Sequence, residues 1–227
     1  MDISLHYIKK GSGTPLLLLH GNGESGDYFV HQMDEFARYF TVYAVDTRGH
    51  GKSPRGTAPF TISQFADDLL GFMDGQGIEK AHILGFSDGG NIALTFALRH
   101  PERVGRLVLN GANLDPAGVK PSVQIPIVLG CKLASLFKAP KARANAELLG
   151  LMVNEPHIDP KELGRLTMPV LVIVGSRDMI KASHSQLIAV SLPNGRLVTV
   201  EGDHFIANKQ PEPFNRAVLE FLKEETP

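Results

Sequence analysis

Short apolar runs alternate along this chain with segments of helical pattern, and this alternation limits the folds that the chain can adopt. Residues 16–19 form a continuous apolar run, which is typical of a strand buried on both faces of a sheet. Runs of the same kind occupy residues 40–46, 80–86, 104–112 and 168–176, and a weaker one occupies residues 195–202. Residues 3–9 alternate apolar and polar side chains, which predicts a strand that turns through the sequence KKGSG into the first run.

The segments between these runs carry helix signals. Thr61 and Gln64 have the spacing of a capping box, which predicts a helix with Phe65 and Leu69 facing inward. A second helix is predicted over NIALTFALRH, ending at Pro101, and an amphipathic helix over PEPFNRAVLEFLKEE. Strands that alternate with helices predict an α/β fold, in which a mostly parallel central sheet has helices on both faces.

Residues 115–166 interrupt this alternation. The segment is rich in helix formers and apolar side chains, but it contains no clear strand. We therefore expect a single domain over residues 1–227, with a short helical cap inserted at 115–166. A length of 227 residues and a hydrophobic content of 43% suit one domain with a sizeable core.

Composition argues against several classes of protein. A formal net charge of −1 gives no basic excess for binding nucleic acid or an acidic membrane surface. No apolar run reaches the ~18 residues of a membrane span, and the first residues lack the apolar region of a signal peptide. Cys131 is the single cysteine, so no internal disulfide can form. We expect a cytoplasmic protein without a membrane span, either a monomer or a homodimer.

A Gly-x-Ser-x-Gly pattern stands between an apolar strand and a helix, in the sequence ILGFSDGGNIAL at residues 83–94. That is the setting of a nucleophile elbow, in which a sharp turn exposes the serine, here Ser87. The helix N-terminus then points its free N–H groups at a developing oxyanion. A structural explanation stays open at this point, because serine commonly caps a helix and glycines commonly make turns.

A nucleophilic serine needs a base, and the base needs an orienting acid. Asp178 follows the strand in PVLVIVGSRD, and His204 follows the last strand in LVTVEGDHF. We expect both at the sheet edge that carries Ser87, which favours a triad of these three residues. Asp203 is a competing acid, but adjacent residues usually point apart, so Asp178 is preferred. Each residue also has an ordinary alternative, as a helix cap or a surface side chain.

One motif favours a different class of protein. Gly21, Gly23 and Gly26 follow a strand with the spacing of a dinucleotide-binding loop. Asp46 lies about 20 residues further on, where such a loop has its ribose-binding acid. A dinucleotide-dependent oxidoreductase is therefore an alternative. It is disfavoured because an apparent hairpin strand precedes the loop and because it leaves the serine, aspartate and histidine pattern unexplained.

Five segments resemble the α/β-hydrolase fold superfamily and occur in the order that this family has. They are HGNGES (20–25), DTRGHGKS (46–53), GFSDGG (85–90), VIVGSRDMI (172–180) and GDHF (202–205). These segments span nearly the whole chain, and together they are specific for the superfamily but not for a substrate. The resemblance implies a small single-domain serine hydrolase, with residues 115–166 as a short cap over the site. It also implies that DTRGHGKS is a scaffold turn.

The resemblance implies a role for each site residue. Ser87 is expected as the nucleophile, His204 as the general base and then acid, and Asp178 as the orienting acid. The backbone N–H groups of Asn22 and Asp88 are expected to form the oxyanion hole. Haloalkane dehalogenases and epoxide hydrolases of this fold have an aspartate at the elbow, so Ser87 sets this chain apart from them.

The substrate pocket can be predicted only in outline. Phe86, Met179 and Phe205 flank the triad in sequence, and we expect them to line the pocket. Further candidate walls from the cap are Ile125, Ile127, Val128, Leu133, Leu136 and Phe137. If these apolar residues line the site, the substrate is a small to medium, largely apolar molecule.

The expected reaction is hydrolysis of a small-molecule carboxylic ester through an acyl-enzyme, without a metal or other cofactor. The same triad also serves thioesterases, amidases, carbon–carbon bond hydrolases and cofactor-free peroxidases, and these stay open. The SDGG elbow is similar to that of amino-acid ester hydrolases of the valacyclovirase type, which is a hint from few residues.

Overall fold

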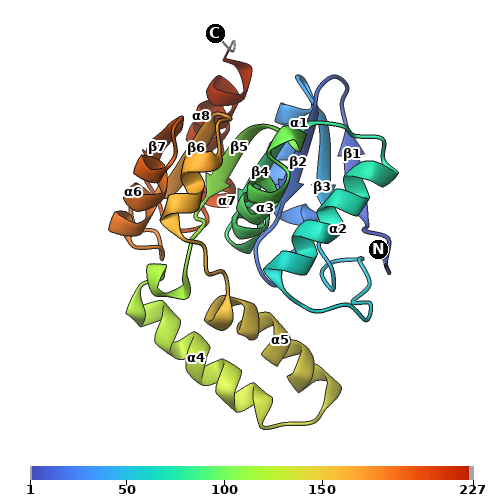
Figure 1. Ribbon diagram of the computed structural model, residues 1–227, viewed down its shortest axis with the longest axis vertical. Helices are drawn as coiled ribbons and strands as arrows, with labels where there is room; N and C mark the ends of the chain where they lie inside the picture. Colours follow the sequence, from blue (N-terminus) through green and yellow to red (C-terminus); the bar gives the residue numbers. More distant parts are fainter. Residues whose placement is uncertain (1, 225–227) are drawn as a thin grey trace.

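Seven strands form one central sheet in the structure, a computed structural model that describes residues 2–224 (Figure 1). The strands are β1 (Tyr7–Lys10), β2 (Pro15–Leu19), β3 (Thr41–Val45), β4 (Ala81–Phe86), β5 (Val104–Asn110), β6 (Val170–Gly175) and β7 (Gly195–Val200). Their order across the sheet is β1-β3-β2-β4-β5-β6-β7, and β1 runs antiparallel to β3 while the other pairs are parallel. The predicted mostly parallel sheet is confirmed.

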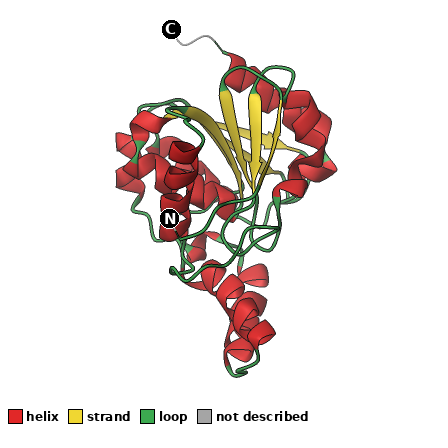
Figure 2. Cartoon of the chain, turned by 90° about the vertical axis from the view of Figure 1, so that its right-hand side faces the viewer, coloured by secondary structure: helices red, strands yellow, loops and turns green. Residues whose placement is uncertain are grey.

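Helices cover both faces of this sheet, as Figure 2 shows. The α-helices are α1 (Val30–Phe36), α2 (Ile62–Gly75), α3 (Asp88–Arg99), α4 (Pro121–Ser135), α5 (Pro140–Asn154), α6 (Ala182–Ser191), α7 (Ile206–Lys209) and α8 (Pro211–Lys223). Short 3-10 turns are η1 (Gly26–Phe29), η2 (Pro101–Arg103), η3 (Pro116–Gly118) and η4 (Pro160–Arg165). One buried cluster joins α2, α3 and α6 to the sheet, and a second joins α1, α7 and α8 to it.

The central strands are apolar because neither of their faces meets water. Leu16 to Leu19 of β2 are each at most 1% exposed, as expected of a parallel strand with helices above and below it. Since β4, β5, β6 and β7 run in the same direction, their carboxyl ends share one edge of the sheet. The loops that follow β4, β6 and β7 carry the serine, the aspartate and the histidine predicted above.

The first strand differs from its prediction. It spans Tyr7–Lys10 rather than residues 3–9, and it pairs with β3 instead of forming a hairpin with β2. Both edges of β2 are already occupied, by β3 and β4. The Tyr7 ring packs against Tyr43 and Phe72 at centroid distances of 5.8 and 5.2 Å. These contacts favour the outer position of β1, beside β3.

The capping box of α2 is only half formed. The Thr61 hydroxyl accepts from the Gln64 N–H at 3.1 Å, as the sequence predicts. The Gln64 amide, however, donates to Asp68 at 3.1 Å instead of returning to Thr61. Asp68 also pairs with Arg48, whose guanidinium is fully buried. This buried pair ties α2 to the loop after β3 and gives Arg48 a place in the scaffold.

The segment 115–166 contains α4 and α5, which form a separate lobe below the body of the molecule in Figure 1. An isolated β-bridge between Val119 and Ile180 joins its start to the loop after β6, and an ion pair between Arg55 and Glu147 at 2.7 Å joins α5 to the loop after β3. Several of its apolar side chains are more than half exposed, namely Ile125, Leu129, Leu133, Leu136 and Phe137. Ile127 and Val128 are half-buried. The lobe therefore packs far less tightly than the sheet and its two helical layers.

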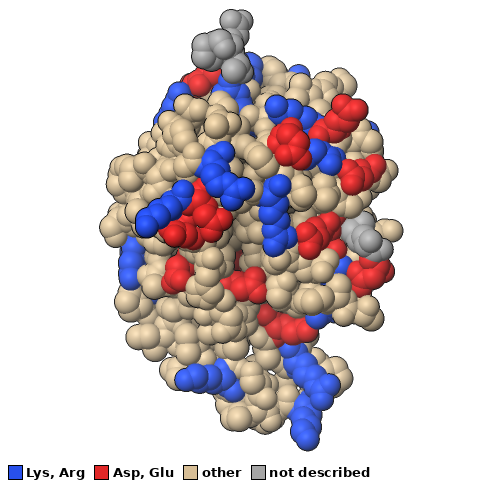
Figure 3. Space-filling view, viewed as in Figure 1, with Lys and Arg blue, Asp and Glu red and all other residues tan. Residues whose placement is uncertain are grey.

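Charged side chains of both signs are interspersed over the body on the face shown in Figure 3, in keeping with a net charge of −1. Residues 121–146 of the lobe contain lysines and an arginine but neither aspartate nor glutamate. None of the helices in the described part of the chain combines the length and apolar character needed to cross a membrane.

Candidate active site

Ser87 lies in the sharp turn between β4 and α3. Its backbone has φ +53° and ψ −121°, and within residues 2–224 it is the only residue other than glycine with a positive φ. The Ser87 N–H donates to the Asn110 carbonyl at 2.8 Å, which anchors the turn to β5. The Ser87 side chain makes no capping bond to α3. The alternative that this serine merely caps a helix is therefore wrong.

The glycines of the elbow are required by close backbone approach. A Cβ added at Gly85 would collide with the Gly89 carbonyl, and one added at Gly89 would collide with the Leu19 carbonyl. An added Cβ at Gly90 would lie 2.9 Å from the Ala112 side chain. The first turn of α3 thus sits directly against the end of β2, which brings the loop after β2 next to Ser87.

His204 bridges the serine and the aspartate. Its Nε2 lies 3.0 Å from the Ser87 hydroxyl, and its Nδ1 lies 2.7 Å from Asp178 Oδ1. His204 and Asp178 are each only 4% exposed. The competing acid Asp203 accepts from the Phe205 N–H at 2.9 Å and pairs with Lys209 instead. Three separate strand ends therefore bring the predicted nucleophile, base and orienting acid into contact.

The surroundings of Asp178 keep it ionised. Burial alone would raise its pKa, but hydrogen bonds and the nearby His204 lower the pKa below its usual value. The Ile180 N–H donates to Oδ1 at 2.9 Å, and the Gly175 N–H donates to Oδ2 at 3.2 Å. A carboxylate here accepts the Nδ1–H of His204, which leaves Nε2 free to accept the serine proton.

The structure places both predicted oxyanion donors beside the elbow. Asp88 is the first residue of α3, so its N–H belongs to the unpaired helix N-terminus. Asn22 lies in the loop after β2, and its side-chain amide donates to the Leu148 carbonyl of α5 at 2.6 Å. The loop that carries one donor is thus tied directly to the helical lobe.

The Asp88 side chain is buried, which was not predicted from the sequence. Burial raises its pKa to about 6, against the lowering effect of the nearby Asn22 and Asn91 amides. The Asn91 amide donates to Asp88 Oδ1 at 3.1 Å, while Oδ2 has no partner within residues 2–224. Asp88 therefore adds a second titratable carboxyl close to Ser87.

The predicted pocket residues lie in different environments. Phe86 is 1% exposed, stacks on Tyr28 at 4.3 Å and packs against the His204 ring at 4.9 Å. Phe205 is 39% exposed and lies 5.6 Å from the same histidine ring. Met179 is half-buried. Phe86 thus supports His204 from the core, whereas Phe205 presents its ring to solvent at the rim.

Gly111 is a site residue that the sequence analysis missed. It follows β5 with φ +64°, and an added Cβ would lie 2.6 Å from His204 Cε1. Its N–H donates to the Ile173 carbonyl at 3.1 Å. The glycine in NGA directly after an apolar strand was the available signal for a close approach at this edge.

Asp46 does not occupy the position of a ribose-binding acid. It is 4% exposed, and its carboxyl accepts from the Gly26 and Lys52 N–H groups at 2.7 and 2.8 Å. The same carboxyl contacts His6 Nδ1 at 2.8 Å. Its oxygens thus hold the protein's own loops together. Over residues 2–224, no three His, Cys, Asp or Glu side chains are grouped as a metal site would require.

Comparisons with known proteins agree with this geometry. Residues 14–128 match the model of the alpha/beta hydrolase fold family. A relative in Caulobacter sp. (strain K31), named as a carbamate hydrolase (RutD), is 33% identical over 99% of this chain and 97% of its own. A relative in Burkholderia vietnamiensis is 31% identical over 98% of this chain and 92% of its own, and is named 2-hydroxy-6-oxononadienedioate/2-hydroxy-6-oxononatrienedioate hydrolase.

A solved structure with the same fold is a thermophilic esterase from Thermogutta terrifontis. It superposes with a TM-score of 0.81 at 25% identity and covers 97% of this chain and 93% of its own. The sheet order, the elbow and the family match lead to one conclusion. This chain belongs to the α/β-hydrolase fold family.

Proposed function

We propose that this hydrolase cleaves small to medium, largely apolar carboxylic esters with a Ser87–His204–Asp178 triad, through an acyl-enzyme. The observation that carries the proposal is the pair of contacts made by His204, at 3.0 Å to the serine hydroxyl and 2.7 Å to the aspartate. A base held between a nucleophile and an orienting carboxylate is the arrangement that activates serine at neutral pH.

The reaction follows from these contacts. The Ser87 oxygen attacks the ester carbonyl while its proton passes to His204 Nε2, and the Asp178 carboxylate stabilises the imidazolium that results. The N–H groups of Asn22 and Asp88 receive the oxyanion, and each such donor is worth roughly 3 kcal/mol. His204 then protonates the leaving alcohol. Water attacks the acyl-enzyme by the same route in reverse and releases the acid.

The lobe at 115–166 would act as the cap over this site. The bond from Asn22 to the Leu148 carbonyl brings α5 to the rim of the oxyanion loop. Phe205 and the exposed apolar residues of α4 offer surfaces for an apolar acyl or alcohol group. A cap of two helices favours a small or medium substrate over a long acyl chain.

Carbamate hydrolysis is the second candidate, because a relative that spans nearly the whole chain is named as a carbamate hydrolase. A carbamate has an acyl carbonyl that the same serine can attack and the same N–H groups can stabilise. The relative named as a hydrolase of 2-hydroxy-6-oxo-dienedioates keeps carbon–carbon bond cleavage among the alternatives for this triad.

A chromogenic substrate series tests the proposal. We expect p-nitrophenyl acetate and butyrate to be hydrolysed faster than p-nitrophenyl octanoate, because the cap leaves room for a short acyl chain. A p-nitrophenyl carbamate, measured in parallel, distinguishes the second candidate. Faster turnover of the carbamate would replace the ester assignment, and a folded protein that leaves every member of the series intact would contradict the proposed function.

A further inference from the structure

Glu24 is a half-buried acid beside the triad that the proposed reaction does not use. It closes the turn that follows β2, because the Glu24 N–H donates to the Gly21 carbonyl at 3.3 Å. Gly23 takes the third position of this four-residue turn with φ +76°, a conformation that favours glycine there. Asn22, which carries one of the proposed oxyanion donors, is thereby held at the second position.

The Glu24 side chain adds a second hydrogen bond within the same turn. Its Oε2 accepts from the Gly21 N–H at 3.2 Å, and the His20 ring contacts the Gly21 carbonyl through Nδ1 at 2.7 Å. Both polar groups of Gly21 are therefore bonded. The Asn22 N–H, by contrast, donates to no protein acceptor within residues 2–224. The turn is thus restrained around the donor while the donor itself stays available.

The Glu24 carboxyl lies close to the reacting groups. A Cβ added at Gly21 would lie 3.1 Å from Glu24 Oε2 and 3.0 Å from the Phe86 ring. Phe86 directly precedes Ser87, and its ring centroid is 4.9 Å from that of His204. A change at the Glu24 carboxyl therefore reaches the oxyanion loop and the triad over short distances.

Two titratable groups, His204 and Tyr28, lie near the Glu24 carboxyl. Burial raises the pKa of Glu24 to about 7, although the Gly21 N–H and the charge of His204 lower it. Burial raises the pKa of Tyr28 in η1, and the charges of Glu24, Asp203 and Asp178 raise it further, so this phenol stays neutral. Glu24 is thus partly ionised at neutral pH, and its carboxylate form is the stronger acceptor for the Gly21 N–H.

We propose that Glu24 is a positioning residue of this hydrolase, whose carboxylate holds the Gly21 N–H and so aims the Asn22 N–H at the oxyanion. This inference rests on the proposed function, because it presupposes an oxyanion at that position. Glu24 acts through the turn rather than on the substrate. Removal of the Glu24 carboxylate leaves the Asn22 N–H in place but less firmly held, since the backbone bonds of the turn remain.

Three variants test this role, namely Glu24→Ala, Glu24→Gln and the control Asp27→Ala, which changes an exposed acid on the same segment. We expect Glu24→Ala to lower kcat on p-nitrophenyl acetate about tenfold and to change KM less than about twofold, because an oxyanion donor is worth about 10²–10³ in kcat and only part of that is lost. Glu24→Gln keeps a neutral acceptor and should restore kcat to within about threefold of wild type. The control Asp27→Ala should have the same kcat and KM as wild type.

A pH series adds a readout that a merely structural role would not move. As the pH rises through about 7 the wild-type carboxyl ionises, whereas glutamine cannot. The ratio of wild-type kcat to Glu24→Gln kcat should therefore increase between pH 6 and pH 8. This ratio also decides the question if the alanine variant does not fold, which circular dichroism and a thermal melt would show.

Two outcomes separate the inference from the function on which it rests. A folded Glu24→Ala variant with unchanged kcat, or a ratio that is constant with pH, would overturn the role of Glu24 and leave the hydrolase assignment intact. A wild-type protein that hydrolyses none of the esters would overturn the proposed function and the role of Glu24 with it.

Discussion

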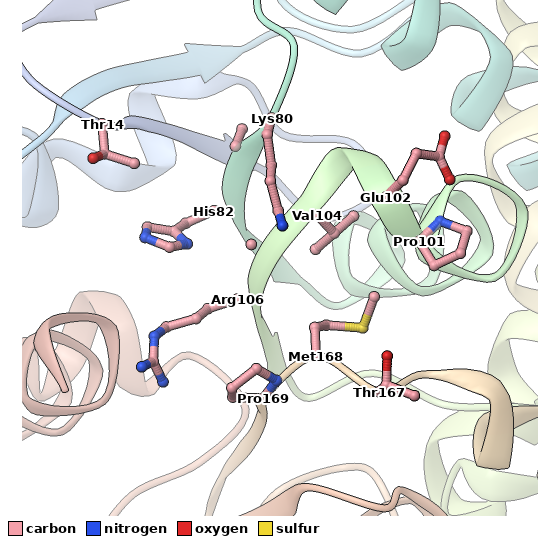
Figure 4. A pocket seen from close by; sticks show the side chains of 12 residues that line it. Thr14, Lys80, His82, Pro101, Glu102, Val104, Arg106, Thr167, Met168 and Pro169 are labelled. Carbon is pink, nitrogen blue, oxygen red and sulfur yellow. The ribbon is translucent and has the colours of Figure 1, made fainter. Parts of the chain in front are cut away.

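The two edges of the sheet each carry a histidine, buried in the case of His204 and half-buried in the case of His82, but only the edge with His204 brings a serine and a carboxylate to the ring. At the carboxyl edge, both nitrogens of His204 are bonded, one to Ser87 and one to Asp178. At the amino edge, His82 lines a hollow of about 720 Å³ together with Lys80 and Arg106, whose side chains are drawn in Figure 4. His82 Nδ1 is buried there and has no hydrogen-bond partner within residues 2–224.

The two histidines differ in their hydrogen-bond partners, and these partners distinguish the candidate active site better than the size of a hollow does. Burial lowers the pKa of His82 to about 4, and the charges of Arg106 and Lys80 lower it further, so the ring is neutral at pH 7. The Phe40 ring packs edge-on against it at 5.8 Å. Among the described residues 2–224, no serine or carboxylate is bonded to the His82 ring to activate or orient it. His82 is therefore a half-buried ring without such partners, while His204 has the contacts expected of a base.

Removing either end of the nucleophile–base pair should have the largest effect. We expect Ser87→Ala and His204→Ala each to lower kcat on p-nitrophenyl butyrate by about 10⁶, because triad members act as a unit. His82→Ala at the opposite edge should leave kcat within about twofold. Steady-state kinetics of the three purified variants checks this contrast, which fails if His82→Ala is as inactive as His204→Ala.

The orienting acid comes next. Asp178→Asn should lower kcat by about 10⁴, because an amide cannot hold the imidazole in the tautomer that accepts the serine proton. Asp203→Asn is the matched control, since that neighbouring carboxyl pairs with Lys209 and not with His204. Equal losses in the two variants would show that the acid has been misassigned.

Gly111→Ala should have an intermediate effect. The new Cβ would lie 2.6 Å from His204 Cε1 and would sit on a residue with φ +64°, so both the histidine and the backbone must shift. We expect kcat to fall roughly 10- to 100-fold, because a shift of His204 by about 1 Å would misplace it relative to Ser87. Gly164→Ala, where an added Cβ meets open space, serves as the control. Full activity in Gly111→Ala would contradict the tight packing behind His204.

The smallest effect concerns the pH dependence of stability. The pKa of His82 falls from 6.5 to about 4 in the folded chain, so the unfolded chain binds more protons between these values. The stabilisation that comes from a neutral His82 is therefore complete above pH 6.5 and is lost as the pH falls toward 4. His82→Gln should flatten this part of the stability curve in urea titrations, and a pH dependence identical to wild type would argue against a neutral His82 in the folded chain.

The sequence was most informative where a single chemical need shapes a long stretch. Apolar runs predicted the strands because both faces of a parallel sheet are buried, and the glycines around Ser87 predicted the elbow because no side chain fits there. The order of serine, aspartate and histidine at strand ends placed all three at one edge. These features depend on local pattern and on strand direction alone.

Other features depend on contacts between segments far apart in sequence. The pairing of β1 with β3 was missed, because alternation predicts a strand but not its neighbour. The close approach of Gly111 to His204 and the bond from Glu24 to the Gly21 N–H arise only once the loops meet. The residues of α4 that were candidate pocket walls are largely exposed, because helical spacing does not say what faces them.

Labelling with a fluorophosphonate shows whether Ser87 is an activated nucleophile, because such a probe bonds covalently to an activated serine. Wild-type protein, Ser87→Ala and His204→Ala would be treated together, and the modified peptide would be mapped by mass spectrometry. We expect one label per chain, on Ser87, in the wild type and none in either variant. A folded wild-type protein that takes up no label, or equal labelling of Ser87 in His204→Ala, would contradict this expectation.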